Sequence, residues 1–377
     1  MIKEVNSFHS GKFTYNGIFS GRPGKLVRAQ ALIDMVASVP VLPEVAEQKL
    51  VRLPAASIHA QASIEGSTLS LSEVENIISQ KEGVIGHDPL AIRIYNLKNL
   101  YKYIASQSSE EGFEITSDTV HSALGILVKG LSGSKDEEGH YRNGEAKVYK
   151  DLPDCSWNPP SSRLDVNFLM KNFYLWINSD EMKSAGSLFR AVCTHLYIAK
   201  ILPFHSFNGV IGRYAESLIV RSGGGRFVPY SLSIFYNNNR ERYLKELAGF
   251  FDTNDPSSFA DFAAEGVIDT LQDISRQSIE NVQGVTLENY LENLLKEKRI
   301  NKRQFELLML LVNVPEGFTP PELQLKKEYV KLYGKVSRTT VARDVKKLHE
   351  MGLLKGTEDD RFYLNRGILT SCVRSFF

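Results

Sequence analysis

Residues 202–213 read Leu-Pro-Phe-His-Ser-Phe-Asn-Gly-Val-Ile-Gly-Arg, and this stretch decides the fold that the sequence indicates. Apolar residues recur at helical spacing over residues 188–199 and stop before Pro203. A second apolar run begins at Val210 and ends at the three glycines of residues 223–225. The stretch is therefore predicted to be a loop that connects two apolar helices and leads directly into the second.

The start of that second helix is the first candidate site. Backbone N–H groups fan out at a helix N-terminus, where the macrodipole also favours an anion. Asn208 and Gly209 are predicted to stand at this N-terminus, with Gly212 and Arg213 following within the next turn. We therefore predict an anion cradle formed by these four residues. Taken alone, an Asn-Gly pair is also an ordinary turn, and Arg213 a solvated helix residue.

The same stretch resembles, without gaps, the signature of the Fic/Doc family of AMP-transferring proteins, His-Pro-Phe-x-Asp/Glu-Gly-Asn-Gly-Arg-x-x-Arg. The matching residues are Pro203, Phe204, Asn208, Gly209 and Arg213. The differing residues, which stand where His, Asp/Glu, Gly and Arg belong, are Leu202, Ser206, Phe207 and Val210. The resemblance implies a mainly α-helical fold, a Fic-type helical core with a small β-hairpin flap. It also implies relation to proteins that transfer AMP from ATP to a protein hydroxyl.

A rival register would start the motif at His205 instead. The Asp/Glu, Gly, Asn and closing Arg positions would then fall on Gly209, Val210, Ile211 and Glu216. We prefer the first register for two reasons. His195 lies seven residues before Leu202, as similar family members have a His before theirs, and Gly212-Arg213 reproduces the end of the motif.

The replaced positions determine which chemistry is expected to survive. In the family, the motif His accepts the proton of the attacking hydroxyl, and Leu202 cannot do so; a positioned base contributes about 10²–10⁴-fold. The Asp/Glu holds Mg²⁺, for which the neutral Ser206 is a poor substitute, so no metal ligand is predicted. Val210 removes one phosphate-facing cation. His205 remains open as a displaced base.

A second element, residues 56–66, reads Ala-Ser-Ile-His-Ala-Gln-Ala-Ser-Ile-Glu-Gly and is predicted to be a helix that starts near Pro54 and ends at Gly66. It looks like the inhibitory helix of Fic proteins, Ser/Thr-x-x-x-Glu-Gly/Asn, with Gln61 in place of Ser/Thr. At the C-terminal end the macrodipole disfavours the Glu65 carboxylate by roughly 0.3–1 kcal/mol. The resemblance pairs Glu65 with Arg213, which would block productive binding of the γ-phosphate; the alternative is a solvated Glu65.

A third element, residues 139–148, places short strand-like pieces on both sides of Asn143-Gly144 and is predicted to be a β-hairpin. It is similar to the flap that precedes the Fic core, whose edge receives a segment of the target protein as an added strand. The resemblance therefore assigns target docking to Tyr141, Arg142, Asn143 and Gly144. An Asn-Gly hairpin is also a common structural turn.

Composition limits the function classes. The 377 residues are 42% hydrophobic with a net charge of +1, so no global field favours a nucleic acid or a membrane. No run of eighteen apolar residues predicts a membrane span. Cys155, Cys193 and Cys372 are unpaired by spacing, which indicates a reducing compartment, the cytoplasm, and no zinc site.

Pattern changes divide the chain into four predicted parts. Residues 1–110 form an N-terminal helical region with the Glu65 helix, in which Ser70-x-x-Glu73 is predicted to be a capping box. Residues 111–276 form the Fic-like core, and residues 277–300 a connecting helix. Residues 301–377 differ in charge, with thirteen Lys/Arg against nine Asp/Glu between positions 301 and 366.

This last part resembles a winged helix-turn-helix, an α+β module that reads DNA in bacterial regulators. Helices are predicted over residues 304–312 and 321–333, and a third after the cap Ser337; residues 352–354 and 362–364 are the predicted wing strands. The resemblance assigns DNA contacts to Arg338, Thr339, Thr340 and Arg343. Winged helices also serve as plain protein-interaction modules.

Three functions from different classes fit these motifs. The first is a degenerate Fic protein, a regulatory pseudoenzyme that binds a nucleotide such as ATP or another anion but transfers AMP weakly or not at all. The second is an active protein AMP-transferase that uses a displaced residue such as His205. The third is a DNA-binding transcriptional regulator with a Fic-like sensor domain. The resemblance also suggests a target protein and a homodimer.

Overall fold

The computed structural model describes residues 1–38, 43–81, 85–106, 112–133, 136, 139–145, 151–314 and 316–368, with backbone alone at 43–52, 273, 277 and 313. The chain divides into two compact units, Met1–Arg276 and Gln277–Phe377. The division falls at the predicted end of the core. Residues 1–110 and 111–276, treated separately in the sequence, lie within one unit.

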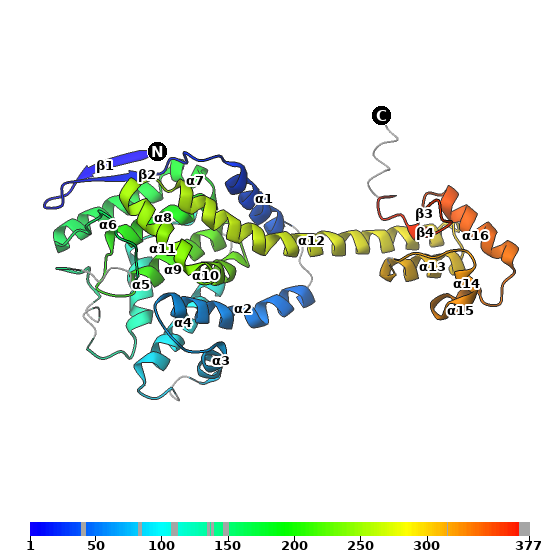
Figure 1. Ribbon diagram of the computed structural model, residues 1–377, viewed down its shortest axis with the longest axis horizontal. Helices are drawn as coiled ribbons and strands as arrows, with labels where there is room; N and C mark the ends of the chain where they lie inside the picture. The colour runs from blue at the N-terminus through cyan, green and yellow to red at the C-terminus, as the bar shows by residue number, and fades with distance from the viewer. Residues whose placement is uncertain are drawn as a thin grey trace. The chain divides into compact units, whose positions relative to one another are not determined.

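The first unit is mainly α-helical, as expected, and opens with an antiparallel hairpin of β1 (Ile2–Asn6) and β2 (Lys12–Asn16) (Figure 1). Its further elements are α1 (Gly24–Ser38), α2 (Pro43–Ile64), α3 (Leu71–Ser79), α4 (Pro89–Ser106), α5 (Ser117–Val128), α6 (Arg163–Ile177), α7 (Asp180–Ser184), α8 (Ser187–Ile201), α9 (Asn208–Ser222), α10 (Val228–Asn238), α11 (Arg240–Thr253) and the first part of α12 (Ser257–Lys296). The hairpin corrects the expectation of an all-helical N-terminal region. Its Tyr15 is buried and donates a hydrogen bond to the carbonyl of Leu169 at 2.7 Å, so packing on α6 stabilises the strands.

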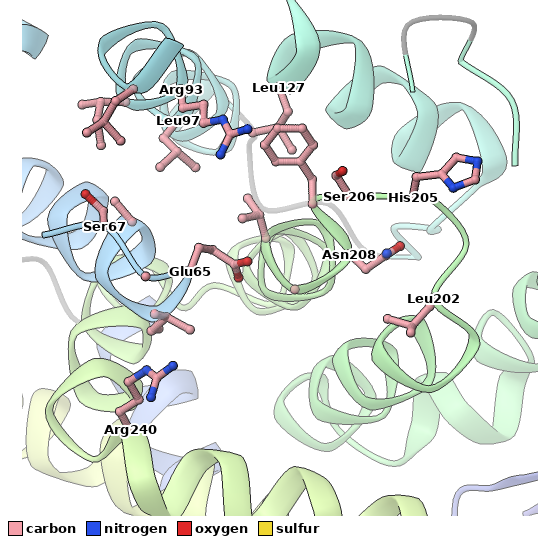
Figure 2. Close-up of a pocket in the computed structure, with 18 of the residues that line it drawn as sticks. Glu65, Ser67, Arg93, Leu97, Leu127, Leu202, His205, Ser206, Asn208 and Arg240 are labelled. Atoms are coloured by element: carbon pink, nitrogen blue, oxygen red, sulfur yellow. The ribbon is translucent and has the colours of Figure 1, made fainter. Parts of the chain in front are cut away.

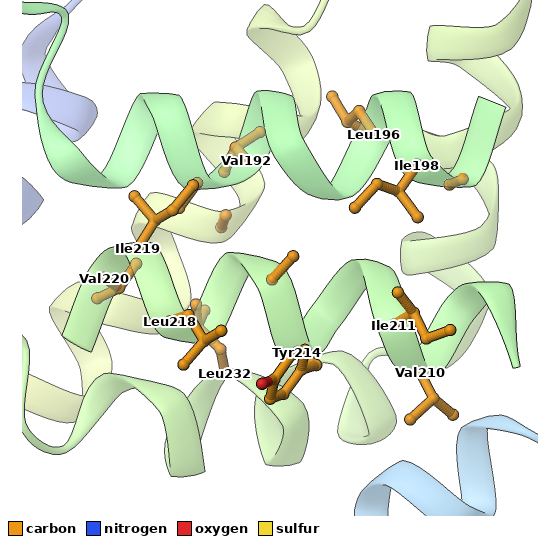
Figure 3. Packing of buried hydrophobic residues seen from close by; sticks show 14 of the residues in the cluster. Val192, Leu196, Ile198, Val210, Ile211, Tyr214, Leu218, Ile219, Val220 and Leu232 are labelled. Carbon is orange, nitrogen blue, oxygen red and sulfur yellow. The ribbon is translucent and has the colours of Figure 1, made fainter. Parts of the chain in front are cut away.

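The central helices α8 and α9 connect through the motif loop and pack along their length (Figure 3). Val192, Leu196 and Ile198 of α8 and Ile211 and Leu218 of α9 are all buried. A Cβ atom on Gly212 would lie 3.0 Å from Cδ2 of His195 and 3.2 Å from its carbonyl oxygen. Gly212 therefore has a packing role, because only a glycine permits this close approach of the two helices.

Two local predictions in the first unit have opposite outcomes. Ser70 and Glu73 form the predicted capping box at the start of α3, with the Glu73 N–H donating to Ser70 Oγ at 3.3 Å. The helix α2, which ends at Ile64 directly before Glu65, starts at Pro43 and not near Pro54, which lies inside it. An interior proline removes one helical hydrogen bond, and the buried Ile58 and Ile64 further along α2 supply packing that offsets this loss.

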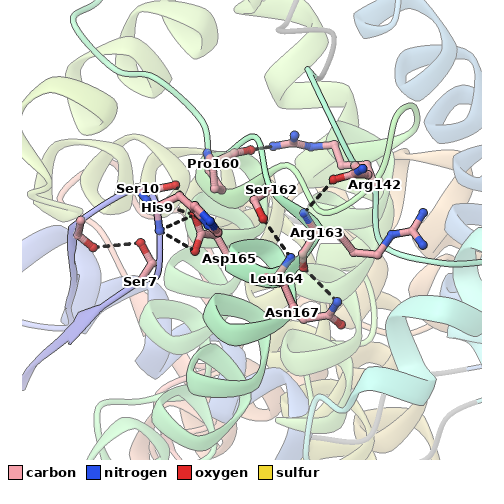
Figure 4. A network of polar contacts seen from close by, with 12 residues as sticks. Ser7, His9, Ser10, Arg142, Pro160, Ser162, Arg163, Leu164, Asp165 and Asn167 are labelled. Atoms are coloured by element: carbon pink, nitrogen blue, oxygen red, sulfur yellow. Dashed lines mark hydrogen bonds and ion pairs between the residues drawn. The ribbon is translucent and has the colours of Figure 1, made fainter.

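The described part of the predicted flap forms no hairpin and packs against the motif loop. Residues 139–145 contain no strand, and residues 146–150 lie outside the described residues. The buried Arg142 donates hydrogen bonds to the carbonyl oxygens of Leu202 at 2.5 Å and Pro160 at 2.5 Å, the latter visible in Figure 4, and to that of Gly144. Burial lowers the pKa of Arg142 to about 10. Arg142 thus fixes the start of the motif loop, and its side chain is no part of an exposed docking edge.

Asp165 connects the hairpin to the helices (Figure 4). It is buried near the N-terminus of α6 and accepts hydrogen bonds from the Ser10 N–H at 3.0 Å, the Ser10 hydroxyl at 2.8 Å and the His9 N–H at 3.1 Å. These bonds lower the pKa of Asp165 although burial opposes the shift. The turn of the hairpin is therefore pinned to α6 by one carboxylate.

The second unit forms around its own apolar core, which includes Leu287 and Leu291 of α12. Its further elements are α13 (Lys302–Asn313), α14 (Glu322–Leu325), α15 (Lys327–Tyr333), α16 (Arg338–Glu350), β3 (Leu354–Gly356) and β4 (Phe362–Leu364). The helix predicted over residues 321–333 is interrupted at Lys326, whose ψ of 137° is extended. The first wing strand lies two residues later than predicted, with Leu354 paired to Leu364.

Among the described helices, none combines the length and apolar character needed to cross a membrane.

Candidate functional site

A cavity of about 410 Å³ lies at the start of α9 in the first unit (Figure 2). The motif loop, the end of α2, α4, α5 and the start of α11 form its walls. Its charged and polar lining residues include Glu65, Ser67, Arg93, His205, Ser206, Asn208 and Arg240, and its apolar ones include Ile64, Leu97, Leu127, Leu202, Phe207, Val210 and Leu244. This volume lies within the range of small-molecule sites, roughly 300–1,000 Å³.

The predicted cradle has the expected backbone and an unexpected side chain. Asn208 and Gly209 begin α9 and line the cavity, and the N-cap residue Phe207 makes no side-chain cap. The Asn208 amide turns away from the helix end: its Nδ2 donates to the Phe204 carbonyl at 2.8 Å, and its Oδ1 accepts from the Phe204 N–H at 2.9 Å. Asn208 therefore holds the loop closed, and no side chain of the N-cap residue caps the backbone N–H groups at the start of α9.

Both ends of the loop hold non-glycine residues in the left-handed region. Leu202 ends α8 with φ 50°, and Phe207 precedes α9 with φ 63°. Each such residue costs about 1–2 kcal/mol. Strain of this kind concentrates at ligand sites, where the surrounding structure holds the backbone in place.

Three residues at the chemically important positions lie in the cavity wall. Leu202 is buried and apolar, so no base occupies the motif His position. Ser206 is exposed and offers one neutral hydroxyl. His205 is half-buried, and its backbone N–H donates to Oδ1 of the buried Asp136 at 2.9 Å. Figure 2 shows the His205 ring directed away from Glu65.

The predicted contact between Glu65 and Arg213 is present. Arg213 NH2 lies 2.5 Å from Glu65 Oε1, and its Nε donates to Gln61 Oε1 at 2.6 Å. The Arg213 side chain is only 1% exposed, whereas that of Glu65 is 38% exposed and reaches the cavity. Arg213 itself is absent from the lining. Arg213, which the sequence analysis assigned to anion binding, therefore bonds to residues of the protein itself.

A buried polar network continues from Arg213 into the core. Arg213 NH1 donates to the Tyr243 hydroxyl at 2.9 Å, and that hydroxyl lies 3.0 Å from His195 Nε2. Since Tyr243 accepts from Arg213, its proton is available to His195 Nε2. The proton of His195 then belongs on Nδ1, which lies 3.1 Å from Glu216 Oε2. Tyr236 donates to the other Glu216 oxygen at 2.8 Å.

Burial dominates the acidity of this network. It raises the pKa of Tyr243 to about 12, although the nearby Arg213 opposes the shift. Burial and the Glu216 carboxylate also raise the pKa of Tyr236 well above its ordinary value. Both tyrosines thus remain neutral donors at physiological pH. The network holds Arg213 in place and supplies no base to the cavity.

Sequence reasoning missed two cations on the cavity wall. Arg93 of α4 lies over the ring of Phe207, with its guanidinium carbon 5.7 Å from the ring centroid. Arg240 begins α11 and pairs with Asp151 at 3.1 Å. Neither residue belongs to a motif, and both reach the site through helices distant from residues 202–213. A single sequence carries no signal that would have identified them.

The donor set does not fit Mg²⁺. Glu65 is the lone carboxylate among the cavity-lining residues that the structure describes, and Arg213 neutralises it. No group of three His, Cys, Asp or Glu side chains in the described part of the chain could hold a metal ion. Mg²⁺ prefers carboxylate oxygens in near-octahedral geometry, which a lone Ser206 hydroxyl cannot provide.

The second unit presents a separate candidate surface on α16. Ser337 caps this helix as predicted, accepting from the Thr340 N–H at 3.3 Å. Basic and small residues share its solvent face; the exposed ones are Arg338, Thr339, Ala342, Arg343, Lys346 and Lys347, while Thr340 is half-buried. On the opposite face the buried Asp344 accepts from Arg303 at 2.7 Å and Gln304 at 2.9 Å.

No protein-family model matches the sequence. The structure is similar to that of a Fic family protein from Desulfovibrio desulfuricans, with a TM-score of 0.57 and 20% identity over 93% of this chain and 98% of that chain. The chain has the Fic fold. A single-residue variant of Fic-1 from C. elegans matches with a TM-score of 0.52 and 17% identity over 66% of this chain and 70% of that chain.

A third similar structure is a Fic domain containing signaling protein from Bacteroides thetaiotaomicron. Its TM-score is 0.51 at 13% identity, over 67% of this chain and 96% of that chain. In this structure Asn208 and Gly209 stand at the helix start that lines the cavity. These similarities show the fold of the chain.

Proposed function

We propose that the first unit is a nucleotide-binding Fic-type domain that transfers AMP weakly or not at all and has a regulatory role. The observation that carries the proposal is the pair Leu202 and Ser206 in the cavity wall, an alkyl group and a neutral hydroxyl at the two positions of proton transfer and metal binding. A cavity with an uncapped helix N-terminus and two arginines supports retained binding.

The experiment follows AMP incorporation from labelled ATP beside calorimetric titration of ATP. The wild type should bind ATP without incorporation, and Glu65→Gly should loosen the restraint on the triphosphate and change its affinity. The double substitution Leu202→His with Ser206→Asp should create incorporation that Leu202→Gln with Ser206→Asn does not. Robust incorporation by the wild type would contradict the proposal. Unchanged ATP affinity in Glu65→Gly would count against the restraint by Glu65.

A second candidate function for the same unit is AMP transfer with His205 as a displaced base. His205 lies on the cavity wall, which favours it over other histidines. The direction of its ring, away from Glu65, makes a change of side-chain rotamer necessary. Loss of wild-type incorporation in His205→Ala would support this alternative.

For the second unit we propose DNA binding through α16. The solvent face described above carries Arg338, Arg343, Lys346 and Lys347, with no acidic residue on that face before Glu350. Phosphate contacts make affinity fall with salt. We expect the full chain to bind labelled random-sequence duplex DNA, and Arg338→Ala to reduce the slope of log affinity against log salt by about 1. Lys296→Ala, a basic residue outside α16, is the control; no binding would favour the protein-interaction module.

The remaining proposals come from the sequence and from its family resemblance. We keep a homodimer, a target protein docked near Asn143 and Gly144, and a cytoplasmic location among them. Light scattering of the purified chain tests the dimer. Crosslinking from a photoreactive residue placed at Asn143 tests the docking segment.

A further inference from the structure

The cavity has the charge of a small anion site. Its described lining contains one carboxylate, Glu65, whose charge Arg213 balances at 2.5 Å. Arg240 is paired with Asp151 at 3.1 Å. Arg93 then remains as the cation whose charge no ion pair balances among the described residues, and Figure 2 shows Arg93 and Arg240 on opposite sides of Glu65.

Arg93 is also positioned for an anion at the start of α9. Its guanidinium lies over the ring of Phe207, the residue that precedes the first turn of α9. A cation–π contact at this distance leaves the N–H donors of the guanidinium free of hydrogen bonds to the ring, so they can bind phosphate oxygens in bidentate fashion. Phe207, the residue that departs from the family's glycine, thereby supports the cation that replaces the one missing at Val210.

Nucleoside monophosphates and triphosphates differ in the negative charge that the cavity must balance. A phosphate monoester carries about −1.5 to −2 at pH 7, which one unpaired arginine and a helix N-terminus can largely balance. A triphosphate carries more charge, usually shared with Mg²⁺ held by a carboxylate. As shown above, the cavity offers Mg²⁺ no free carboxylate among its described residues.

We propose that the cavity binds a nucleoside monophosphate without metal, with Arg93 as the principal phosphate contact. This inference rests on the proposed nucleotide-binding function and names its ligand class and its binding residue. The chain then responds to the monophosphate as a ligand, and Mg²⁺ plays no part in its affinity.

The test is calorimetric titration of AMP and of ATP into the full chain, each with excess Mg²⁺ and with a chelator. We expect AMP to bind more tightly than ATP, with the same affinity in both solutions. Arg93→Gln should weaken AMP binding roughly 10-fold or more, and Arg93→Lys less, because lysine lacks the planar fork. Arg163→Gln removes an exposed arginine of α6 outside the cavity and should leave the affinity unchanged.

The outcomes separate this inference from the function on which it rests. Tight binding of ATP that requires Mg²⁺, or AMP affinity that Arg93→Gln leaves unchanged, overturns the inference and keeps the nucleotide-binding function. Absence of binding by AMP and by ATP under all conditions overturns both. Circular dichroism of each variant verifies that Arg93→Gln is folded, as expected for an exposed side chain.

Discussion

The helices α9 and α16 both bury charged side chains near residues that bond them, and they leave different charges exposed. In α9 the buried cation is Arg213, which contacts Glu65, Gln61 and Tyr243, and the buried anion Glu216 lies one turn further along. In α16 the buried charge is the anion Asp344, surrounded by Arg303, Gln304 and Tyr333. Burial of either charge is tolerated because every partner is a hydrogen-bonding group in direct contact.

The two helices differ in which charged groups they leave available to contact a ligand. Because α9 turns its arginine inward, the anion site proposed above uses backbone N–H groups and Arg93 from another helix. Because α16 turns an aspartate inward, its arginines and lysines stay exposed to solvent. A motif arginine therefore predicts ligand contact only when the fold leaves it unpaired. Substituting the buried charges tests this comparison.

The largest effect is expected for Arg213→Ala. The substitution removes the side chain at the centre of the buried network. Gln61 and Tyr243 each lose the hydrogen bond that Arg213 donates to them. A buried group left without its hydrogen bond costs about 1–3 kcal/mol, and the half-exposed Glu65 regains solvent, so the first unit should melt at a clearly lower temperature. Arg163→Ala, at an exposed position of α6, is the control. A melting temperature equal to that of the wild type would mean that the network contributes little to stability.

A smaller effect is expected for Asp344→Asn in the second unit. The shape is kept, but Arg303 and Gln304 both donate to this position, and an amide offers one acceptor in place of a carboxylate. Losing hydrogen bonds to a charged group costs about 1.5–3 kcal/mol. Hydrogen exchange should become faster in α13 and α16 and stay unchanged in α8 and α9. Equal hydrogen-exchange rates of α16 in the wild type and the variant would mean that Asp344 does not stabilise this helix. Asp359→Asn, at an exposed site, is the control.

The sequence predicted the features that depend on neighbouring residues. The capping serines Ser70 and Ser337 act on N–H groups three residues away, so their role is visible in a short window. The start of α9 at Asn208 and the end of α8 before Pro203 follow in the same way. The fold followed from these local signals together with the family resemblance.

The composition of the cavity could not be predicted, because its contacts join residues far apart in the chain. Gln61 and Arg213 are 152 positions apart, and no pattern announces that one accepts from the other. Arg93 approaches Phe207 from α4, and Arg142, assigned to a docking edge, is buried beneath the loop. The Glu65–Arg213 contact was found because the resemblance supplied the pairing that local sequence lacks.

Lys200 of α8 offers the sharpest contrast, since it is a buried cation with no carboxylate in an ion pair among the described residues. Its ammonium donates to Asn254 Oδ1 at 2.8 Å and to the Phe251 carbonyl at 3.3 Å. Burial lowers the pKa of Lys200 from 10.5 to about 8. The folded state therefore binds this proton less tightly than the unfolded chain does.

The smallest effect at neutral pH is expected for Lys200→Met, within about 1 kcal/mol, because the lost hydrogen bonds offset the relieved desolvation. The pH dependence is more informative. Between the lowered pKa of about 8 and the ordinary value of 10.5, the unfolded state binds more protons at Lys200, so this group makes wild-type stability rise with pH. Lys200→Met lacks that contribution, and the stability of the wild type relative to the variant should increase over this window in urea unfolding. An exposed Lys245→Met control should give a constant difference. A constant difference for Lys200→Met as well would mean that a buried cation needs no counter-ion here, and the contrast with Arg213 would no longer hold.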